Sequence, residues 1–371
     1  MKIAVLKETA PGAARVSATP ETVKKFIALG ASVAVEAGAG AGASIPDADY
    51  QAAGAVIGSA AETVKDADIV LGVQGPAPES LAGAGAGAWI VAGLDPFGQR
   101  ARVEAYAAAG AEALAMEFMP RITRAQSMDI LSSQSNLAGY KAVSEAASAY
   151  GRAFPMMMTA AGTITAAKAF VMGVGVAGLQ AIATARRLGA QVSATDVRSA
   201  TREQIESLGA KAIFVENVQG IEGEGAGGYA TEMSEEYKAA QAELVSAHLA
   251  KQDIVITTAL IPGRPAPRLI SDAQIASMRP GSVIFDLAVA QGGNVEGSKA
   301  DETVIRHGVK IIGYANTPAH LAADEMGIDD FQASRSPDAK YYRTTPLRGL
   351  FARLKPGLYH DGRFADLNAV L

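Results

Sequence analysis

Three glycines in the stretch Lys168–Asp196, namely Gly173, Gly175 and Gly178, have the spacing of a phosphate-binding turn. Gly173 permits a tight turn, Gly175 lets a pyrophosphate approach the backbone, and Gly178 lets a helix pack closely on a strand. The helix that follows would direct its free N–H groups and its partial positive charge at phosphate oxygens. Asp196, about twenty residues further on, is placed to accept hydrogen bonds from both ribose hydroxyls of an adenosine, and its charge repels a 2′-phosphate. These residues predict a dinucleotide site that prefers NAD to NADP.

The segments around these glycines have the order that such a site requires. The apolar run Ala169–Met172 predicts a buried strand, and Leu179–Leu188 predicts a helix that ends at Gly189. Gln191–Thr195 predicts a second strand, and Asp196 follows it directly. A glycine motif alone is a weak signal, but a strand before it and a helix and an acidic residue after it make the signal strong. The alternative interpretation is a glycine-rich turn that binds nothing.

A second group of polar residues lies in the segment Pro120–Asp129, which contains Arg121, Gln126 and Asp129. The segment follows a predicted strand, and α/β sheets carry their sites at the carboxyl ends of their strands. An arginine, an amide and a carboxylate can hold a nicotinamide carboxamide and a ribose without donating a proton. A surface turn with a local ion pair explains the same residues, and the residues alone favour that interpretation slightly.

The rest of the sequence offers little other catalytic chemistry. The four histidines lack the spacing of metal ligands, and we interpret them as exposed or structural side chains: His248, His307, His320 and His360. The sequence contains no cysteine, which excludes a disulfide framework and a thiol nucleophile. No nucleophile elbow, Walker loop or pair of carboxylates is recognisable. We therefore expect no metal site and no acid–base or nucleophilic centre.

Composition and charge are those of a soluble globular protein. Of the 371 residues, 49% are hydrophobic and 19% are charged, which supports a sizeable core. The net charge of −5 and the lack of a long basic run argue against nucleic acid as a partner. Charged residues at Lys2 and Lys7 come too early for a signal peptide. The apolar stretch Ala153–Thr184 is interrupted by Pro155 and by glycines, which argues against a membrane span. We expect a soluble, cytoplasmic protein.

The length and the order of apolar and helical runs predict two α/β domains. Short apolar runs alternate with helical ones in both, which indicates parallel sheets with helices on both faces. We expect the first domain at residues 1–131, with a return of the chain at about 320–371, and the NAD-binding domain at residues 132–319. A long helix, Ile130–Ala153, leads from one to the other.

The individual elements follow from the same patterns. The predicted strands are Lys2–Lys7, Ser32–Glu36, Ile69–Val73, Trp89–Val91, Ala113–Met116, Ala212–Val215, Asp253–Thr258, Val283–Leu287 and Lys310–Tyr314. The further predicted helices are Pro20–Leu29, Asp47–Ala53, Arg202–Leu208 and Ser234–Lys251. The glycine-rich segment Asn217–Gly228, followed by Tyr229, is compatible with a lid over a bound nucleotide and equally with a plain loop.

Several blocks of the sequence match one family. They are PRITRAQSMDILSSQSNLAGYKAV, GVGVAGLQAIATARRLGA, TDVR, GGYA.EM, TTALIPGRPAP and PGSVIFDLA..GGN, with KE..PG..RV..TPE..KK...LG near the N-terminus. These blocks resemble the NAD(H)-binding subunit (domain I) of the proton-translocating nicotinamide nucleotide transhydrogenases, and RAQSMDILSSQSNLAGY is specific to that family. The resemblance covers roughly residues 1–323. The segment that follows Ala323, DEMGIDDFQASRSPDAKYYRTTP, departs from the family's pattern, which resumes at LRGLFARLKPGLYHDGRFADLNAVL.

The resemblance implies two Rossmann-like domains with NAD(H) in the cleft between them, and a homodimer. It implies direct hydride transfer between NADH and NADP(H) held on a beta subunit. It further implies coupling through a membrane-embedded subunit to proton translocation, with this chain peripheral on the inner face of the plasma membrane. By matching motif, Arg121, Gln126 and Asp129 form the catalytic loop that positions the nicotinamide and approaches the NADP(H) partner. The expected cofactor-binding residues are Ser132, Gly173, Gly175, Val176, Ala177, Gly178, Asp196, Val197, Arg198, Tyr229, Thr258, Ala259 and Leu260.

Two other functions agree with parts of the sequence. A soluble alanine dehydrogenase, to which the chain is more distantly similar, needs a carboxylate anchor and a proton donor, and Arg15 matches that family's anchor. However, Gly72–Gln74 stands where the dehydrogenases have a lysine-bearing KVK, WIVAGLDPF lacks their histidine, and Ala290 replaces their aspartate. A non-catalytic NAD-binding protein would keep the glycine motif and lose the polar segment at Arg121–Asp129.

Overall fold

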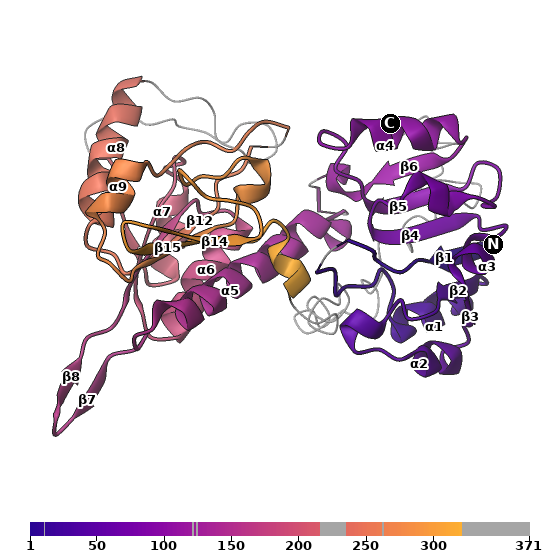
Figure 1. The fold of residues 1–371 in the computed structure, drawn as a ribbon, viewed down its shortest axis with the longest axis horizontal. Helices are drawn as coiled ribbons and strands as arrows, with labels where there is room; N and C mark the ends of the chain where they lie inside the picture. Colours follow the sequence, from indigo (N-terminus) through magenta and orange to yellow (C-terminus); the bar gives the residue numbers. More distant parts are fainter. Residues whose placement is uncertain (11, 121, 124, 216–234, 262, 321–371) are drawn as a thin grey trace. The chain divides into compact units, whose positions relative to one another are not determined.

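The computed structural model describes the chain except residues 11, 121, 124, 216–234, 262 and 321–371. Two compact units, Met1–Ser133 and Gln134–Pro318, make up the described chain and are called unit 1 and unit 2 below. Each unit is an α/β fold built on one main sheet of mostly parallel strands (Figure 1). The predicted return of the chain beyond about residue 320 and the predicted lid at Asn217–Tyr229 lie outside the described residues.

Unit 1 contains a six-stranded sheet in the order β3-β2-β1-β4-β5-β6, and all its pairings are parallel. Its strands are β1 (Lys2–Val5), β2 (Ser32–Glu36), β3 (Val56–Gly58), β4 (Ile69–Gln74), β5 (Trp89–Gly93) and β6 (Glu112–Ala115). Ile3 of the central strand lies opposite Val33 on one side and Ile69 on the other. The predicted parallel sheet is confirmed, and β3 is a strand that the sequence patterns did not indicate.

Helices cover both faces of this sheet because alternate residues of its strands point to opposite sides. The helices are α1 (Pro20–Ala28), α2 (Asp47–Ala52), α3 (Ala60–Val64) and α4 (Arg100–Ala108). Ile3 and Val5 pack in one buried cluster with residues of α1 and α2, whereas Ala4 packs in a second cluster with residues of α3 and α4. The first turn of α1 forms where the sequence predicts because the Thr19 side chain accepts a hydrogen bond from the Thr22 N–H at 3.3 Å.

Unit 2 contains a seven-stranded sheet in the order β11-β10-β9-β12-β13-β15-β14. Its strands are β9 (Lys168–Met172), β10 (Gln191–Thr195), β11 (Lys211–Ala212), β12 (Ile254–Thr257), β13 (Val283–Asp286), β14 (Glu302–Arg306) and β15 (Val309–Gly313). The expectation of a purely parallel sheet is wrong at one edge, where β14 runs antiparallel to β15. A tight turn at His307 and Gly308, both with positive φ, joins these two strands, and a short hairpin of this kind can only be antiparallel.

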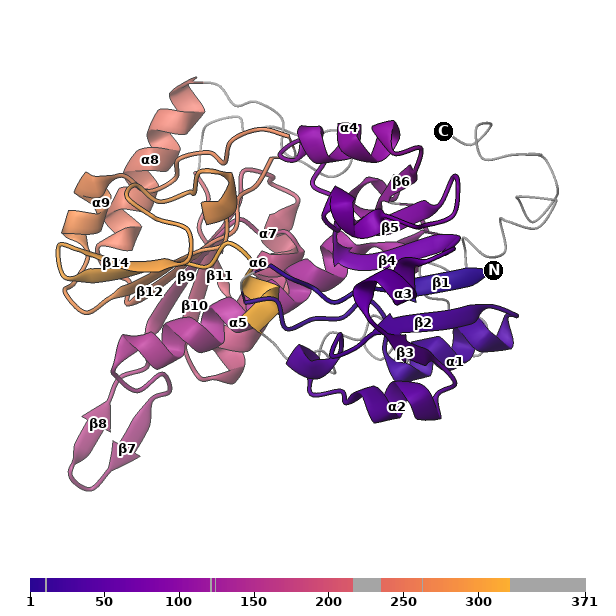
Figure 2. The same cartoon turned by 45° about the vertical axis from the view of Figure 1, so that its right-hand side comes forward.

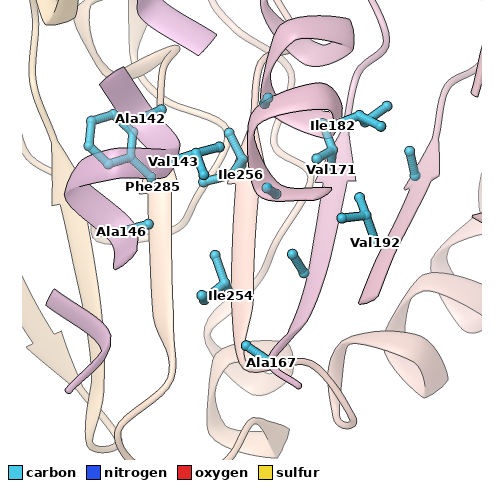
Figure 3. Packing of buried hydrophobic residues seen from close by; sticks show 14 of the residues in the cluster. Ala142, Val143, Ala146, Ala167, Val171, Ile182, Val192, Ile254, Ile256 and Phe285 are labelled. Atoms are coloured by element: carbon cyan, nitrogen blue, oxygen red, sulfur yellow. The ribbon is translucent and has the colours of Figure 1, made fainter. Parts of the chain in front are cut away.

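Two helical layers enclose the sheet of unit 2. The helices are α5 (Ile130–Tyr150), α6 (Val176–Arg187), α7 (Thr201–Ser207), α8 (Glu235–Leu249) and α9 (Asp272–Ser277). Residues of α5, α6 and α7 share one buried cluster with one face of the sheet, and residues of α8 and α9 share another cluster with the other face. Figure 3 shows Val143 of α5 beside Ile256 of β12, with Val171 of β9 close to Ile182 of α6.

A two-stranded antiparallel ribbon, β7 (Met157–Thr159) paired with β8 (Gly162–Ile164), projects from unit 2 (Figures 1 and 2). The sequence patterns did not predict it. It occupies the first half of the apolar stretch Ala153–Thr184, and its residues are exposed. That stretch is therefore divided between the ribbon, β9 and α6. Among the described residues, no helix combines the length and the apolar character needed to cross a membrane.

Candidate functional site

The glycine turn of unit 2 connects β9 to α6, and two of its glycines are required by the geometry. Gly173 has a φ of +99°, which other residues rarely adopt, and a Cβ there would lie 2.6 Å from the Thr258 Oγ1. A Cβ on Gly178 would overlap the carbonyl oxygen of Gly173. The first turn of α6 therefore packs directly on the turn that precedes it. This geometry agrees with the predicted roles of Gly173 and Gly178.

The N-terminus of α6 is shaped to receive an anion. Gly175 is the N-cap residue, it supplies no side-chain capping bond, and a Cβ added to it would meet no atom within 4 Å. The open space in front of Gly175 lets phosphate oxygens approach the N–H groups of the first helical turn, which begins with Val176 and Ala177. A pyrophosphate fits the donors present here. The N–H groups and the helix dipole would hold its negative charge without any cationic side chain.

Asp196 follows β10 and closes the glycine turn from the neighbouring strand. Its side chain is 8% exposed, and its Oδ2 accepts a hydrogen bond from the Val174 N–H at 2.6 Å. The Arg198 guanidinium lies against the same carboxylate, with Nε 3.0 Å from Oδ1 and Nη2 3.1 Å from Oδ2. Val197 separates the two residues. The predicted position of Asp196 beside the glycines agrees with the structure, whereas its pairing with Arg198 was not predicted.

The segment after β12 forms a third side of this site. Its Thr258 Oγ1 donates to the Gly173 carbonyl oxygen at 3.0 Å, which joins the segment to the glycine turn. Ala259 is partly buried, and Leu260 is 39% exposed. The structure therefore places Thr258, and with it the residues that follow, beside Gly173 at the carboxyl edge of the sheet, where parallel sheets bind their ligands.

Asp286 and Asn294, which no sequence pattern had identified as site residues, hold that segment in place. Both side chains are fully buried. The Asn294 Nδ2 donates to the Ala259 and Pro267 carbonyl oxygens at 2.9 and 2.8 Å, and its Oδ1 accepts from the Ala259 N–H at 3.0 Å. Asp286 accepts in turn from the Asn294 N–H at 3.2 Å. The block PGSVIFDLA..GGN contains both residues, and an acidic residue at a strand's carboxyl end is the signal that could have identified them.

Helix α5 supports the site from behind. Gly139 of α5 has no room for a side chain, because a Cβ there would overlap the carbonyl group of Ala177 in the first turn of α6. The close approach of α5 thus fixes the start of the helix whose N–H groups would face the phosphates. A glycine in a helix interior costs about 1 kcal/mol relative to alanine, and close packing is the reason to retain one at this position.

The polar segment of unit 1 is only partly described. Arg121 lies outside the described residues. Gln126 is exposed at the start of a short 3₁₀ turn, Gln126–Met128. Asp129 precedes α5 and accepts from the Ser132 N–H at 3.0 Å and from the Ser132 Oγ at 2.6 Å. The structure therefore brings Asp129 and Ser132 together as a helix cap, and neither the segment's catalytic role nor its alternative as a surface turn is tested by these contacts.

A buried carboxylate and a buried guanidinium lie at the carboxyl edge of the sheet in unit 1. Glu8 accepts from the N–H groups of Val73 and Gln74, at 2.5 Å and at 3.3 Å to its closer oxygen. Burial raises the pKa of Glu8, which these hydrogen bonds and Arg15 oppose. Burial also lowers the pKa of Arg15, which the charge of Glu8 opposes. Arg15 thus has a carboxylate of its own chain as its electrostatic partner.

Two of the histidines have structural contacts in unit 2. The His248 ring packs edge-on against Phe170, with ring centroids 4.7 Å apart, and its Nε2 lies 2.7 Å from the Ser193 Oγ. Burial and the neighbouring lysines lower the pKa of His248. The His307 Nε2 lies 3.0 Å from an Asp272 carboxylate oxygen. These contacts confirm the interpretation of His248 and His307 as structural side chains.

Comparisons with known proteins agree with this architecture. Residues 4–138 match the N-terminal domain and residues 142–325 the C-terminal domain of the alanine dehydrogenase/PNT family. The chain is 56% identical over 330 residues to an NAD(P) transhydrogenase subunit alpha of Rhodospirillum rubrum, covering 87% of this chain and 86% of that protein. It is 54% identical to a crystal structure of transhydrogenase from Sinorhizobium meliloti, with a TM-score of 0.81 and coverage of 88% and 90%. Alanine dehydrogenase of Mycobacterium tuberculosis is 30% identical over 86% of this chain and 82% of that enzyme.

The fold and the site define a two-domain α/β protein whose second unit carries a dinucleotide-type glycine turn. The chain belongs to the alanine dehydrogenase/PNT family. Within that family its close homologues are NAD(P) transhydrogenase alpha subunits, and alanine dehydrogenases are more distant. The resemblance predicted from the sequence blocks is therefore confirmed.

Proposed function

We propose that this chain is the NAD(H)-binding component, domain I, of a proton-translocating NAD(P) transhydrogenase. The observation that carries the proposal is the arrangement of Gly173, Gly178 and Asp196 around the open N-terminus of α6. It occurs in a chain whose close homologues are named NAD(P) transhydrogenase alpha subunits. We propose that NADH bound at unit 2 supplies a hydride to NADP held by a partner.

The residues of unit 2 would bind and orient the dinucleotide. The N–H groups of the first turn of α6, Val176 to Gly178, would hold the pyrophosphate, and Asp196 would accept from the adenosine ribose. The segment Thr258–Leu260 would border the same site. Tyr229 lies outside the described residues, so its role as a lid rests on the matching motif alone.

The polar segment of unit 1 would position the reacting end. Arg121, Gln126 and Asp129, with Ser132, would hold the nicotinamide and face the NADP(H) partner. Hydride transfer between two nicotinamide rings needs no general acid or base. It needs the two reacting carbons about 3–3.5 Å apart in a site that excludes water. Scarcity of proton-transferring groups supports this chemistry, since the sequence has no histidine in Met1–Ser133.

The assembly belongs to the same proposal. The relatives' name, subunit alpha, indicates a protein of several subunits. We propose a homodimer that works with an NADP(H)-binding beta subunit and a membrane-embedded subunit. Hydride transfer would be coupled to proton translocation in the complete complex, with this chain peripheral on the inner face of the plasma membrane.

Alanine dehydrogenase activity is the second candidate, and the edge of unit 1 argues against it. Such an enzyme must bind the carboxylate of its substrate and transfer a proton. Here Gln74 ends β4, where the dehydrogenases have a lysine, and Ala290 replaces their aspartate. The one matching anchor, Arg15, interacts with the carboxylate of Glu8, with which a substrate carboxylate would have to compete.

The purified chain, mixed with the NADP(H)-binding domain of a transhydrogenase, tests the proposal. We expect NADH to reduce an NADP analogue in this mixture, and we expect no turnover of alanine or pyruvate. NADH binding without transfer would indicate a non-catalytic NAD-binding protein. Reduction of pyruvate in the presence of ammonium would instead assign the chain to the dehydrogenases.

A further inference from the structure

The Asp196 carboxylate has no acceptor position left for a ribose in the described structure. An ionised carboxylate offers about four lone-pair positions, two on each oxygen. Oδ1 accepts from the backbone N–H of Arg198 at 2.9 Å and from its Nε at 3.0 Å. Oδ2 accepts from the Val174 N–H at 2.6 Å and from the Arg198 Nη2 at 3.1 Å. All four positions are thus filled by groups of the chain itself.

The guanidinium of Arg198 occupies the two positions that a ribose would need. If this side chain moves away, one acceptor position opens on Oδ1 and one on Oδ2, and the two backbone N–H bonds remain. Two neighbouring positions, one on each oxygen, are what a pair of adjacent hydroxyls requires. The planar fork of the guanidinium therefore competes with the ribose diol for the same carboxylate.

The backbone of Arg198 is held independently of its side chain. The Thr201 N–H and Oγ1 donate to the Arg198 carbonyl oxygen at 3.1 and 2.7 Å, at the start of α7. The Arg198 N–H stays on Asp196. The guanidinium can consequently leave the carboxylate without displacing the chain, and its cation then remains next to the ribose-binding position. An arginine in that position can accept a 2′-phosphate.

We propose that Arg198 sets the dinucleotide selectivity of this site: it competes with the ribose of NADH for Asp196 and weakens the rejection of NADPH by that carboxylate. The proposal rests on the proposed binding of NAD(H) at unit 2. It changes the simple expectation from Asp196 alone, because the carboxylate carries its own counter-ion. The site therefore rejects a 2′-phosphate less strongly than an unpaired aspartate would.

Binding of NADH and NADPH to the full-length chain tests this proposal, with dissociation constants measured by nucleotide fluorescence. Arg198→Met removes the fork and the charge but keeps an extended apolar side chain. We expect it to bind NADH about fivefold more tightly, since the competitor for two charge-assisted hydrogen bonds is gone, and to bind NADPH about tenfold more weakly. Arg198→Lys keeps the charge without the bidentate fork, so NADPH affinity should stay within about twofold of the native value while NADH binding tightens.

Arg202→Met is the matched control. Arg202 lies one helical turn further on, is exposed, and has its guanidinium 5.1 Å from the centre of the Phe214 ring instead of on Asp196. Its replacement removes the same charge and should leave the ratio of the two affinities unchanged. A ratio in Arg198→Met equal to the native one, or weaker binding of NADH by that variant, would overturn the proposal. If the native chain does not bind NADH at all, the proposed function fails as well, which distinguishes the two failures.

Discussion

The carboxyl edges of the two sheets differ in how firmly their residues are held. In unit 2, Asp196 and Asn294 are buried, and hydrogen bonds join both to neighbouring backbone groups. In unit 1, the comparable edge presents Gln126 and the side chains of Phe97 and Phe118, which are 64% and 57% exposed. These two aromatic rings contact each other edge-on, with centroids 5.6 Å apart.

The difference indicates a division of work between the two units. A fixed set of donors and acceptors in unit 2 suits a ligand that must be held in one orientation, because preorganised groups lose little entropy on binding. An exposed polar and aromatic edge in unit 1 suits contact with a second molecule. This contrast supports the proposal that unit 2 holds the dinucleotide while the segment around Gln126 faces the NADP(H) partner.

The largest expected effect is that of Gly178→Ala. The new methyl group would overlap the Gly173 carbonyl oxygen. Although alanine is the better helix former by about 1 kcal/mol, we expect a net loss of about 3 kcal/mol in the free energy of unfolding, because the strand and helix must separate. NADH affinity should fall at least about tenfold, since the displaced turn no longer presents its N–H groups together. Thermal unfolding and NADH titration measure the two effects.

Gly175→Ala is the control for that variant and sharpens the comparison. Its φ of −81° suits alanine, and the added Cβ would meet no protein atom within 4 Å. Stability should therefore be native, while NADH binding weakens because the methyl group stands where the pyrophosphate would approach. Native affinity in Gly175→Ala would contradict the placement of the phosphates at this turn.

The next effect is expected for Asn294→Ala. The substitution leaves the Ala259 N–H and the Ala259 and Pro267 carbonyl oxygens without their partner. We expect the free energy of unfolding to fall by about 2 kcal/mol and NADH binding to weaken as the Thr258–Leu260 segment loosens. Ser207→Ala, which removes an exposed bond to the Gln204 carbonyl oxygen, should change neither quantity. Native NADH affinity in a destabilised Asn294→Ala would separate this segment from the site.

In unit 1 the expected effect is on rate and not on binding or stability. Gln126→Asn shortens an exposed side chain by one methylene group, so the protein should unfold at the native temperature and bind NADH within about twofold of native affinity. Hydride transfer in the mixture with the NADP(H)-binding domain should slow at least about tenfold, because the reacting groups are positioned less well. Transfer at the native rate would remove the assigned role of this segment.

The smallest effect concerns pH. Burial, together with the neighbouring lysines 211, 251 and 168, lowers the pKa of His248 in the folded protein. The unfolded chain therefore binds a proton at a higher pH than the folded chain does. Stability from this group is present above the ordinary histidine pKa of about 6.5 and is lost as the pH falls toward the folded value. His248→Gln should flatten this part of the unfolding profile, and a profile identical to the native one would exclude the histidine as its cause.

Much of the fold was predictable because its signals are local. The glycine turn, α6 and β10 follow from residues within about thirty positions of one another, and the structure has them at the expected places. Helix α9 was not among the predicted helices, although Ser271 and Gln274 form a capping box that marks its start. Helix α4 carries no comparable signal, because Tyr106 alone of its residues is buried and the helix therefore has no apolar stripe.

The rest of the candidate site depends on contacts between residues far apart in the sequence. Asn294 reaches Ala259 across 35 positions, and no local pattern encodes that pairing. Arg198 lies only two residues from Asp196, yet its position on the carboxylate depends on how the chain turns between β10 and α7. The antiparallel edge strand β14 was missed because its alternating residues are only half-buried or exposed, which leaves a weak pattern.

The most direct test of the proposed function follows the hydride itself. NADH labelled with deuterium at the transferred C4 position is mixed with the chain and the NADP(H)-binding domain in ordinary water, and the NADPH formed is examined by mass spectrometry. We expect the deuterium to pass to NADPH without exchange and the rate of a single turnover to be nearly independent of pH, because the protein supplies position and no proton. Loss of the label to solvent, or a bell-shaped dependence of that rate on pH, would contradict the proposal.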